Sequence, residues 1–95
     1  MRLSKHYLET IRKYFYTVFK EGEIYLFGSR VDDSKKGGDI DLYLVLNDHS
    51  NLFQKKLTFL SRIKRELGEQ RIDVVFNKDN TRLIEQEALK WGIKL

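Results

Sequence analysis

The sequence predicts an α/β fold of the α+β kind, a small mixed sheet with flanking helices in the order α-β-β-α-β-α. Three observations predict it. Three segments carry apolar residues at the steps of a helix, three shorter segments are apolar runs or alternate as strands do, and glycines or polar residues separate them. With 95 residues, 41% of them hydrophobic, the chain can build one core, so we expect a single domain over residues 1–95.

The first helix is expected between Ser4, as its cap, and Gly22, as its stop. Its apolar residues follow helical spacing: Leu8, Ile11, Phe15, Val18 and Phe19. Residues 24–27 are an apolar run closed by Gly28 and Ser29, which indicates a buried strand that enters a tight turn.

Residues 32–38 are polar and end in two glycines, which indicates a loop. Residues 39–46 alternate and predict a strand with Ile40, Leu42, Leu44 and Leu46 on one face. A second helix is expected between Ser50, as N-cap, and Gly68, as stop. Its apolar residues step by three and four: Phe53, Leu57, Leu60, Ile63 and Leu67.

The third strand is expected at residues 72–76, where Ile72, Val74 and Phe76 alternate with Asp73 and Val75. A last helix, ending at Gly92, is predicted by four apolar residues: Leu83, Ile84, Ala88 and Trp91.

The composition excludes several classes of function. Without cysteine the chain has no disulfide, no thiol nucleophile and no thiolate metal site. It has no apolar stretch of the roughly 18 residues that a membrane span needs and no signal peptide, so we expect a cytoplasmic protein with no membrane partner. The 18 basic and 14 acidic residues leave a net charge of +4, which suits an anionic partner.

Three aspartates are predicted to share one face of the sheet. Asp39 and Asp41 are two residues apart on one strand, so their Cα atoms lie about 6.5–7 Å apart on the same face. Asp73 also lies opposite the apolar set of its strand, so the three carboxylates meet if the two strands are neighbours. Clustered carboxylates require a positive charge, and oxygen ligands without histidine or cysteine favour Mg²⁺ or Mn²⁺. The pattern indicates a metal site.

A structural interpretation of the same acids stays open. Asp39 can cap the turn after the glycines, while Asp41 and Asp73 lie on a solvated face and pair with lysines. A calcium-binding loop matches less well, because the acids lie on a strand and not at alternate positions of a turning loop.

The turn after the first strand has the chemistry of a phosphate site. Gly28 lets the backbone approach a ligand closely, and exposed N–H groups with the Ser29 hydroxyl can hold phosphate oxygens. Arg30 adds a charged fork that suits phosphate. An ordinary turn is the alternative, and the glycine-lysine pattern of a Walker loop is absent.

Together these motifs resemble the signature of the nucleotidyltransferase superfamily that includes DNA polymerase β. The sequence shows Phe27-Gly28-Ser29, nine further residues, Asp39-Ile40-Asp41-Leu42, and then Asp73 on a later strand. By its length the chain resembles the minimal nucleotidyltransferases, often encoded as the antitoxin beside a HEPN-domain toxin. The resemblance extends over nearly all of the chain, including the closing Trp91-Gly92-Ile93.

The resemblance implies a polymerase β-like core with a defined site. Gly28, Ser29 and Arg30 would bind the nucleotide, Asp39 and Asp41 would bind a pair of metal ions, and Asp73 would complete the metal-binding catalytic site and help to activate the acceptor hydroxyl. It also implies Mg²⁺ or Mn²⁺ as cofactor, ATP as substrate, and transfer of AMP to a HEPN-domain toxin in a hetero-oligomer.

Two other functions stay open. The chain can be an antitoxin that masks its partner without catalysis, or a transferase for RNA or a small molecule, a class that usually carries a further acceptor domain. Nucleic acid is the less favoured partner, because a basic helix is more often a solvated face. The basic residues of the second predicted helix are Lys55, Lys56, Arg62, Lys64 and Arg65.

Overall fold

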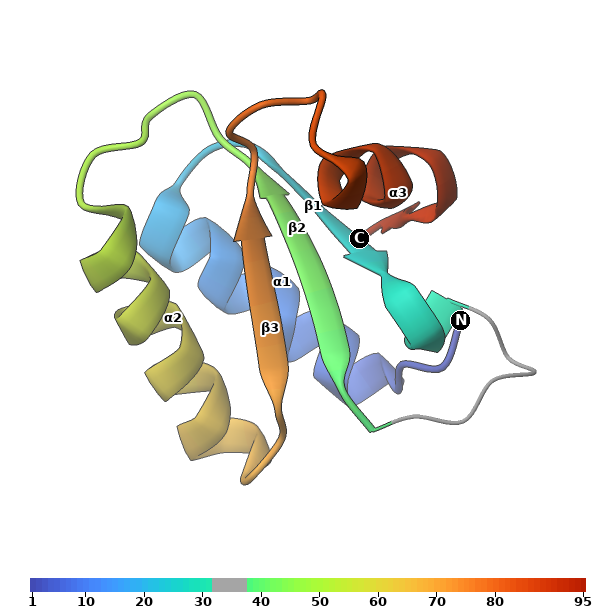
Figure 1. Ribbon diagram of the computed structural model, residues 1–95. Helices are drawn as coiled ribbons and strands as arrows, with labels where there is room; N and C mark the ends of the chain where they lie inside the picture. The colour runs from blue at the N-terminus through green and yellow to red at the C-terminus, as the bar shows by residue number, and fades with distance from the viewer. Residues whose placement is uncertain (32–37) are drawn as a thin grey trace.

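The computed structural model describes residues 1–31 and 38–95, so the predicted loop at residues 32–38 lies, except for Gly38, outside the described residues. Helices cover both faces of a four-stranded mixed sheet with the strand order β3-β2-β1-β4 (Figure 1). This confirms the predicted fold class and element order. None of the described helices is long and apolar enough to cross a membrane.

The sheet combines antiparallel and parallel pairing. β1 (Glu23–Phe27) runs antiparallel to β2 (Ile40–Val45) and to the short β4 (Ile93–Lys94). β2 and β3 (Ile72–Phe76) are parallel, joined through a helical crossover. β4 adds an edge strand that the sequence did not predict.

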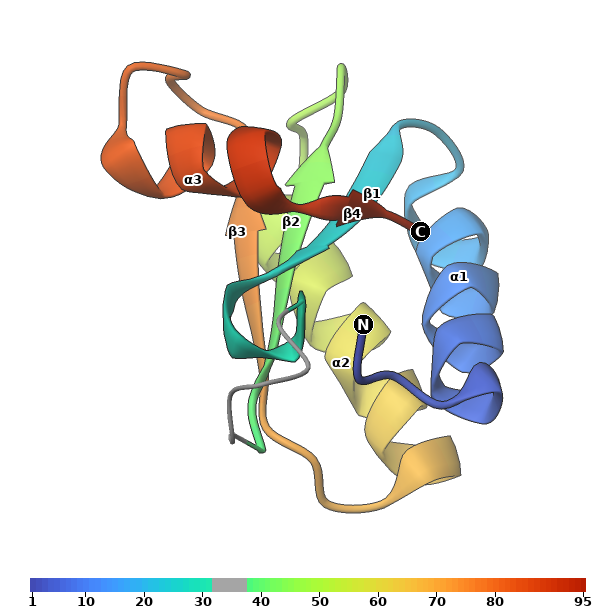
Figure 2. The ribbon, with the colours of Figure 1, turned by 90° about the vertical axis from the view of Figure 1, so that its right-hand side faces the viewer.

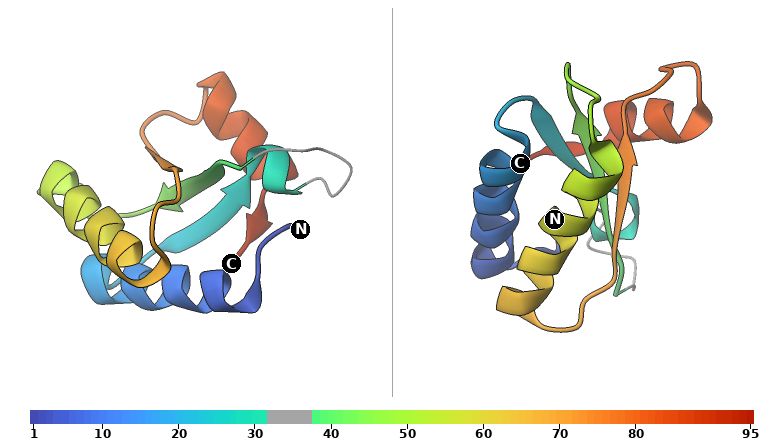
Figure 3. Two further views of the ribbon diagram at one scale, coloured as in Figure 1. Left: turned by 90° about the horizontal axis from the view of Figure 1, so that it is seen from below. Right: turned by 90° about the vertical axis from the view of Figure 1, so that its left-hand side faces the viewer.

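The helices form two unequal layers. α1 (Lys5–Phe19) and α2 (Leu52–Leu67) lie together on one face of the sheet, and α3 (Leu83–Trp91) lies on the other (Figures 2 and 3). The core lies between the sheet and the α1–α2 layer, where Phe19 packs edge-on against Phe59 and Phe76. The buried core residues there are Ile11, Phe15, Phe19, Ile24, Leu26, Ile40, Leu42, Leu44, Leu46, Phe59 and Ile63.

The first helix begins as predicted and ends sooner. The Tyr7 amide donates a hydrogen bond to the Ser4 hydroxyl at 3.2 Å, which confirms Ser4 as the cap. The helix ends at Phe19, where Lys20 adopts the left-handed conformation and its amide bonds the Tyr16 carbonyl, so Gly22 is not the stop.

The second helix corrects two predictions. Its N-cap is Asn51 in the left-handed conformation, with no side-chain cap bond, and not Ser50; Gly68 ends the helix as expected. Phe53 and Leu57, predicted as core, are 72% and 52% exposed, whereas Phe59 is buried. The reason is geometric: α1 flanks this helix, so its buried side turns toward Phe59 and away from Phe53 and Leu57.

The third helix ends at Gly92 as predicted, but of the four apolar residues that predicted it only Ala88 is buried. Leu83 and Trp91 are 83% and 64% exposed, and only Ala88 and Glu85 are buried. The small Ala88 packs against Phe27 and Tyr43 of the sheet.

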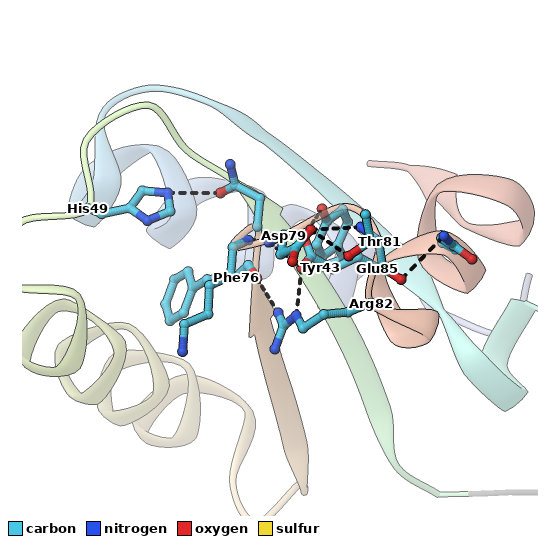
Figure 4. Close-up of polar contacts among 10 residues, drawn as sticks. Tyr43, His49, Phe76, Asp79, Thr81, Arg82 and Glu85 are labelled. Carbon is cyan, nitrogen blue, oxygen red and sulfur yellow. Dashed lines mark hydrogen bonds and ion pairs between the residues drawn. The ribbon is translucent and has the colours of Figure 1, made fainter.

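A buried carboxylate fixes this helix to the sheet. Glu85 accepts hydrogen bonds from the Tyr43 hydroxyl at 2.7 Å, the Asp79 amide at 2.8 Å and the Lys78 amide at 3.0 Å (Figure 4). Arg82 pairs with the same carboxylate at 2.7 Å. These donors replace the water that Glu85 loses on burial, so a polar contact and not an apolar stripe holds α3 in place.

Candidate active site

The candidate site lies on the sheet face that carries α3. Asp41 and Asp73 are register partners in the parallel pair β2–β3, and Asp39 lies directly before β2. Ile40 and Leu42 are buried on the opposite face, so alternation turns the three aspartates away from the main core. The strands are neighbours, which was the condition for the carboxylates to meet.

The Gly-Ser turn lies against the same acids. Phe27, the last residue of β1, pairs with Asp41, and the chain then enters the 3₁₀ turn η1 (Gly28–Val31). Gly28 has φ +77°, and a Cβ atom there would overlap the carboxylate of Asp41. Only glycine fits, because the left-handed backbone and the close approach both exclude a side chain. The turn that carries Ser29 therefore lies directly against Asp41.

Arg30 holds the backbone around this turn. Its guanidinium donates hydrogen bonds to the Arg2 carbonyl at 2.8 Å and the Gly38 carbonyl at 2.9 Å. Arg2 in turn donates to the Ser29 carbonyl at 3.1 Å. Arg30 therefore ties the N-terminal segment and the entry to β2 to the turn, while its contact with phosphate stays a prediction.

Arg71 is a site residue that the sequence interpretation missed. Its Nε lies 3.5 Å from Asp73 Oδ2 and 3.8 Å from Asp39 Oδ2, so one guanidinium spans two of the acids. It precedes Asp73 by two residues and therefore shares its face, a signal that the alternation already contained. The side chain is 71% exposed, so these ion pairs contribute at most about 1 kcal/mol.

The carboxylates of Asp39, Asp41 and Asp73 repel one another, so a positive charge among them would be stabilising. Partial burial raises the pKa of Asp41, and the carboxylates of Asp73 and Asp39 raise it further, while Arg71 partly offsets them. Glu87 of α3 adds to the same rise and is a second residue that the sequence interpretation missed. A cation placed among these groups would stabilise the ionised form of Asp41.

A protein-family model described as "Polymerase beta, Nucleotidyltransferase" matches residues 9–95. The chain belongs to this family. No curated protein matches it. Membership indicates a transferase with a nucleoside triphosphate as substrate, and members generally use a divalent metal ion.

The donor set of this nucleotidyltransferase fits such an ion by its chemistry. Within residues 1–31 and 38–95, no three His, Cys, Asp or Glu side chains are placed to hold one ion as they stand. The donors near the Gly-Ser turn are all carboxylate oxygens, which suit Mg²⁺ or Mn²⁺, and burial together with the neighbouring carboxylates raises the pKa of Asp41. Asp39, Asp41 and Asp73 are the residues that would hold the ion.

The site of this nucleotidyltransferase is open to a ligand. α3 covers Tyr43 and Phe27 through Ala88, beyond the acids along the sheet (Figure 2). The side chains of Asp39 and Asp73 remain 51% and 46% exposed. A triphosphate can therefore approach the turn and the carboxylates from the same side.

Proposed function

We propose that this nucleotidyltransferase transfers a nucleoside monophosphate, AMP from ATP, to a hydroxyl group of a partner protein. One observation supports the proposal above the others: Asp41 pairs with Asp73 on one side and Phe27 on the other, with Gly28 against its carboxylate. A turn suited to phosphate and a cluster suited to a divalent ion are in direct contact there.

Each residue has a proposed role. The backbone N–H groups at Gly28 and the hydroxyl of Ser29 bind phosphate oxygens, and Arg30 supports them with its charge. Asp39, Asp41 and Asp73 hold Mg²⁺ or Mn²⁺, which when bound neutralises charge on the reacting phosphate.

The proposed reaction is an in-line displacement at the α-phosphate. A bond forms between the acceptor oxygen and the α-phosphorus, while the bond from that phosphorus to the leaving pyrophosphate breaks. The hydroxyl proton passes to the Asp73 carboxylate, which acts as the general base. Asp39 and Asp41 orient the reacting phosphate, so the chain contributes chiefly by position and charge.

The proposed acceptor is a HEPN-domain toxin in the cytoplasm, which the chain meets in a hetero-oligomer. The support is the likeness of this short chain to minimal nucleotidyltransferases, together with intact Ser29, Asp39, Asp41 and Asp73.

The test is label transfer from ATP labelled at the α-phosphate to a candidate acceptor protein. We expect labelling with Mg²⁺, none after chelation, and a loss of at least about 100-fold in Asp39→Asn, which removes ligand charge without changing shape. Circular dichroism should show an unchanged fold for the variant. Labelling that survives in Asp39→Asn or ignores the chelator contradicts the proposal.

A second candidate is an antitoxin that masks its partner without catalysis. It is favoured by the exposed apolar side chains of Leu83, Leu89 and Trp91 on α3, which a partner could cover. Asp73→Asn separates the two functions, because it removes the proton acceptor and leaves α3 intact. Under our proposal this variant binds the toxin and leaves it unmodified and active; protection of cells by Asp73→Asn would favour masking.

A further inference from the structure

The outer edge of β3 is open within the described part of the chain, because β3 ends the sheet order there. Its inward backbone groups pair with β2: the Arg71 carbonyl accepts from Ile40 and the Asn77 amide donates to Leu44, both at 3.0 Å. Alternate residues of a strand bond the same neighbour, so the N–H and C=O groups of Ile72, Val74 and Phe76 point outward.

Most of these outward groups are available to another strand. Arg82 occupies one of them, since its Nη2 donates to the Phe76 carbonyl at 3.0 Å (Figure 4). The amides of Ile72, Val74 and Phe76 face outward without a partner strand among the described residues. An edge of this kind is a template for strand addition.

Two exposed apolar residues of α2 lie on the side of this helix that faces away from α1. Phe53 and Leu57 lie one turn apart, and Phe53 is nine residues, or about two and a half turns, from Arg62. Arg62 lines a hollow with Tyr14 of α1, so Phe53 lies on the side of α2 away from α1. Figures 1 and 3 show that β3 lies on that side.

The edge is also hollowed and basic. A hollow of about 330 Å³ runs along it, lined in part by Leu52, Val74 and Phe76. The charged side chains in its lining are those of Lys78 and Arg82, and no acid is among the described residues that line it. The Arg82 charge is paired with Glu85, whereas the Lys78 ammonium has no ion pair within the described residues.

We propose that the β3 edge, with Phe53 and Leu57 of α2, docks an extended segment of a partner protein as a fifth strand. The segment carries apolar residues at alternate positions, which pack beneath Phe53 and Leu57, and a carboxylate at the end that lies beside Lys78. Main-chain hydrogen bonds to Ile72, Val74 and Phe76 supply the affinity. The packing of alternate side chains beneath Phe53 and Leu57 determines which sequences bind.

A second copy of the chain fits this edge poorly. Antiparallel pairing of two β3 strands about Val74 would set Gln70 opposite Lys78, and so bring Arg71 of one copy beside Lys78 of the other. A second copy offers Lys78 no unpaired carboxylate there, because Glu69 already pairs with Lys64 at 3.0 Å and Arg71 with Asp73 at 3.5 Å. An acidic segment supplies a carboxylate to Lys78.

The docking groove goes beyond the proposed transfer and does not depend on it. Strand addition uses the outer edge of β3, whereas Asp73 presents its carboxylate on the sheet face. A catalytically inactive Asp41→Asn chain should dock the segment as well as wild type. The two proposals can therefore fail separately.

Hydrogen exchange with two synthetic capped peptides tests the groove on the full chain. One peptide is Glu-Glu-Val-Thr-Val-Thr-Val-Glu, and the other has lysine at each glutamate position. With the acidic peptide we expect slowed exchange at the outward amides of Ile72, Val74 and Phe76, and little change at Asp73 and Val75, which already bond β2. The basic peptide should bind at least about tenfold more weakly.

Paired surface variants locate the contact. Replacing both Phe53 and Leu57 by serine should weaken the acidic peptide about tenfold, since both are exposed and the fold should survive. Replacing Leu83 and Leu89 on α3 by serine is the matched control and should leave the affinity for the acidic peptide unchanged. No protection up to about 1 mM peptide, equal affinity for both peptides, or protection that grows with chain concentration alone would each overturn the proposal.

Discussion

At the scale of single residues, Gly28 brings the Gly-Ser turn into contact with Asp41. It reaches φ +77°, where other residues are strained, and it leaves room for the Asp41 carboxylate. Gly68 has a similar φ of +83° but faces open space. The two glycines therefore share a positive φ and differ in what a methyl group would meet.

We expect Gly28→Ala to reduce nucleotide transfer at least about 100-fold, because the new methyl group must displace Asp41 or the turn. Gly68→Ala should cost about 1 kcal/mol of folding free energy from its left-handed φ and leave transfer unchanged. Transfer rates and urea unfolding of both variants check this. Equal loss of activity in the two would show that strain, and not contact with Asp41, is the cause.

The face of the sheet on which each strand residue lies could be predicted from the sequence, because burial of one face forces a period of two. That period placed Ile40, Leu42 and Leu44 inward and Asp41 and Asp73 outward, as the structure has them. Contacts made across the fold carry no such local signal. The bonds from Arg30 to the Arg2 and Gly38 carbonyls are of that kind.

At the scale of the elements, the helices show that apolar periodicity predicts where a helix lies in the sequence but not which of its sides is buried. Apolar spacing identified α2, yet which side of it is buried depends on α1, which buries Phe59 and exposes Phe53. In α3 the apolar residues that predicted the helix are mostly exposed, and a carboxylate anchors it. A buried glutamate is not visible in a sequence pattern, because its burial depends on donors from three segments.

The anchor of α3 gives a prediction on stability and pH. Burial by itself would raise the pKa of Glu85, but hydrogen bonds from the Asp79 amide, the Tyr43 hydroxyl, Arg82 and the Lys78 amide outweigh it and lower the pKa from 4.5 to about 2. The native state therefore favours the ionised form, and the difference corresponds to on the order of 3 kcal/mol.

A folded pKa below the unfolded one means that this contribution is full above about pH 4.5 and is lost as the pH falls toward 2. We expect the free energy of unfolding of wild type to exceed that of Glu85→Gln at pH 7, with a gap that narrows steadily below pH 4.5. Urea unfolding of both proteins across this range measures the gap. A gap that is constant with pH would show that Glu85 contributes by packing and not by its charge.

At the scale of the whole molecule, topology assembles the site. β1 runs antiparallel to β2 and β3, so its C-terminal end with the Gly-Ser turn meets the N-terminal ends of the two strands that carry the acids. The α1–α2 layer closes the opposite face, and α3 covers the sheet beyond the acids (Figure 2). The resemblance to the nucleotidyltransferase signature predicted that the acids and the turn form one site, and the pairing of β2 with β1 and β3 brings them together.

The central claim is that the site formed by Asp39, Asp41, Asp73 and the Gly-Ser turn transfers a nucleotide to a partner protein. The most direct measurement is the intact mass of the candidate toxin after co-expression with wild type and with Asp41→Asn. We expect the toxin to gain the mass of one or more nucleoside monophosphates with wild type and none with Asp41→Asn, although both chains bind it. A toxin that is unmodified in the presence of wild type, or equally modified with Asp41→Asn, would contradict the claim.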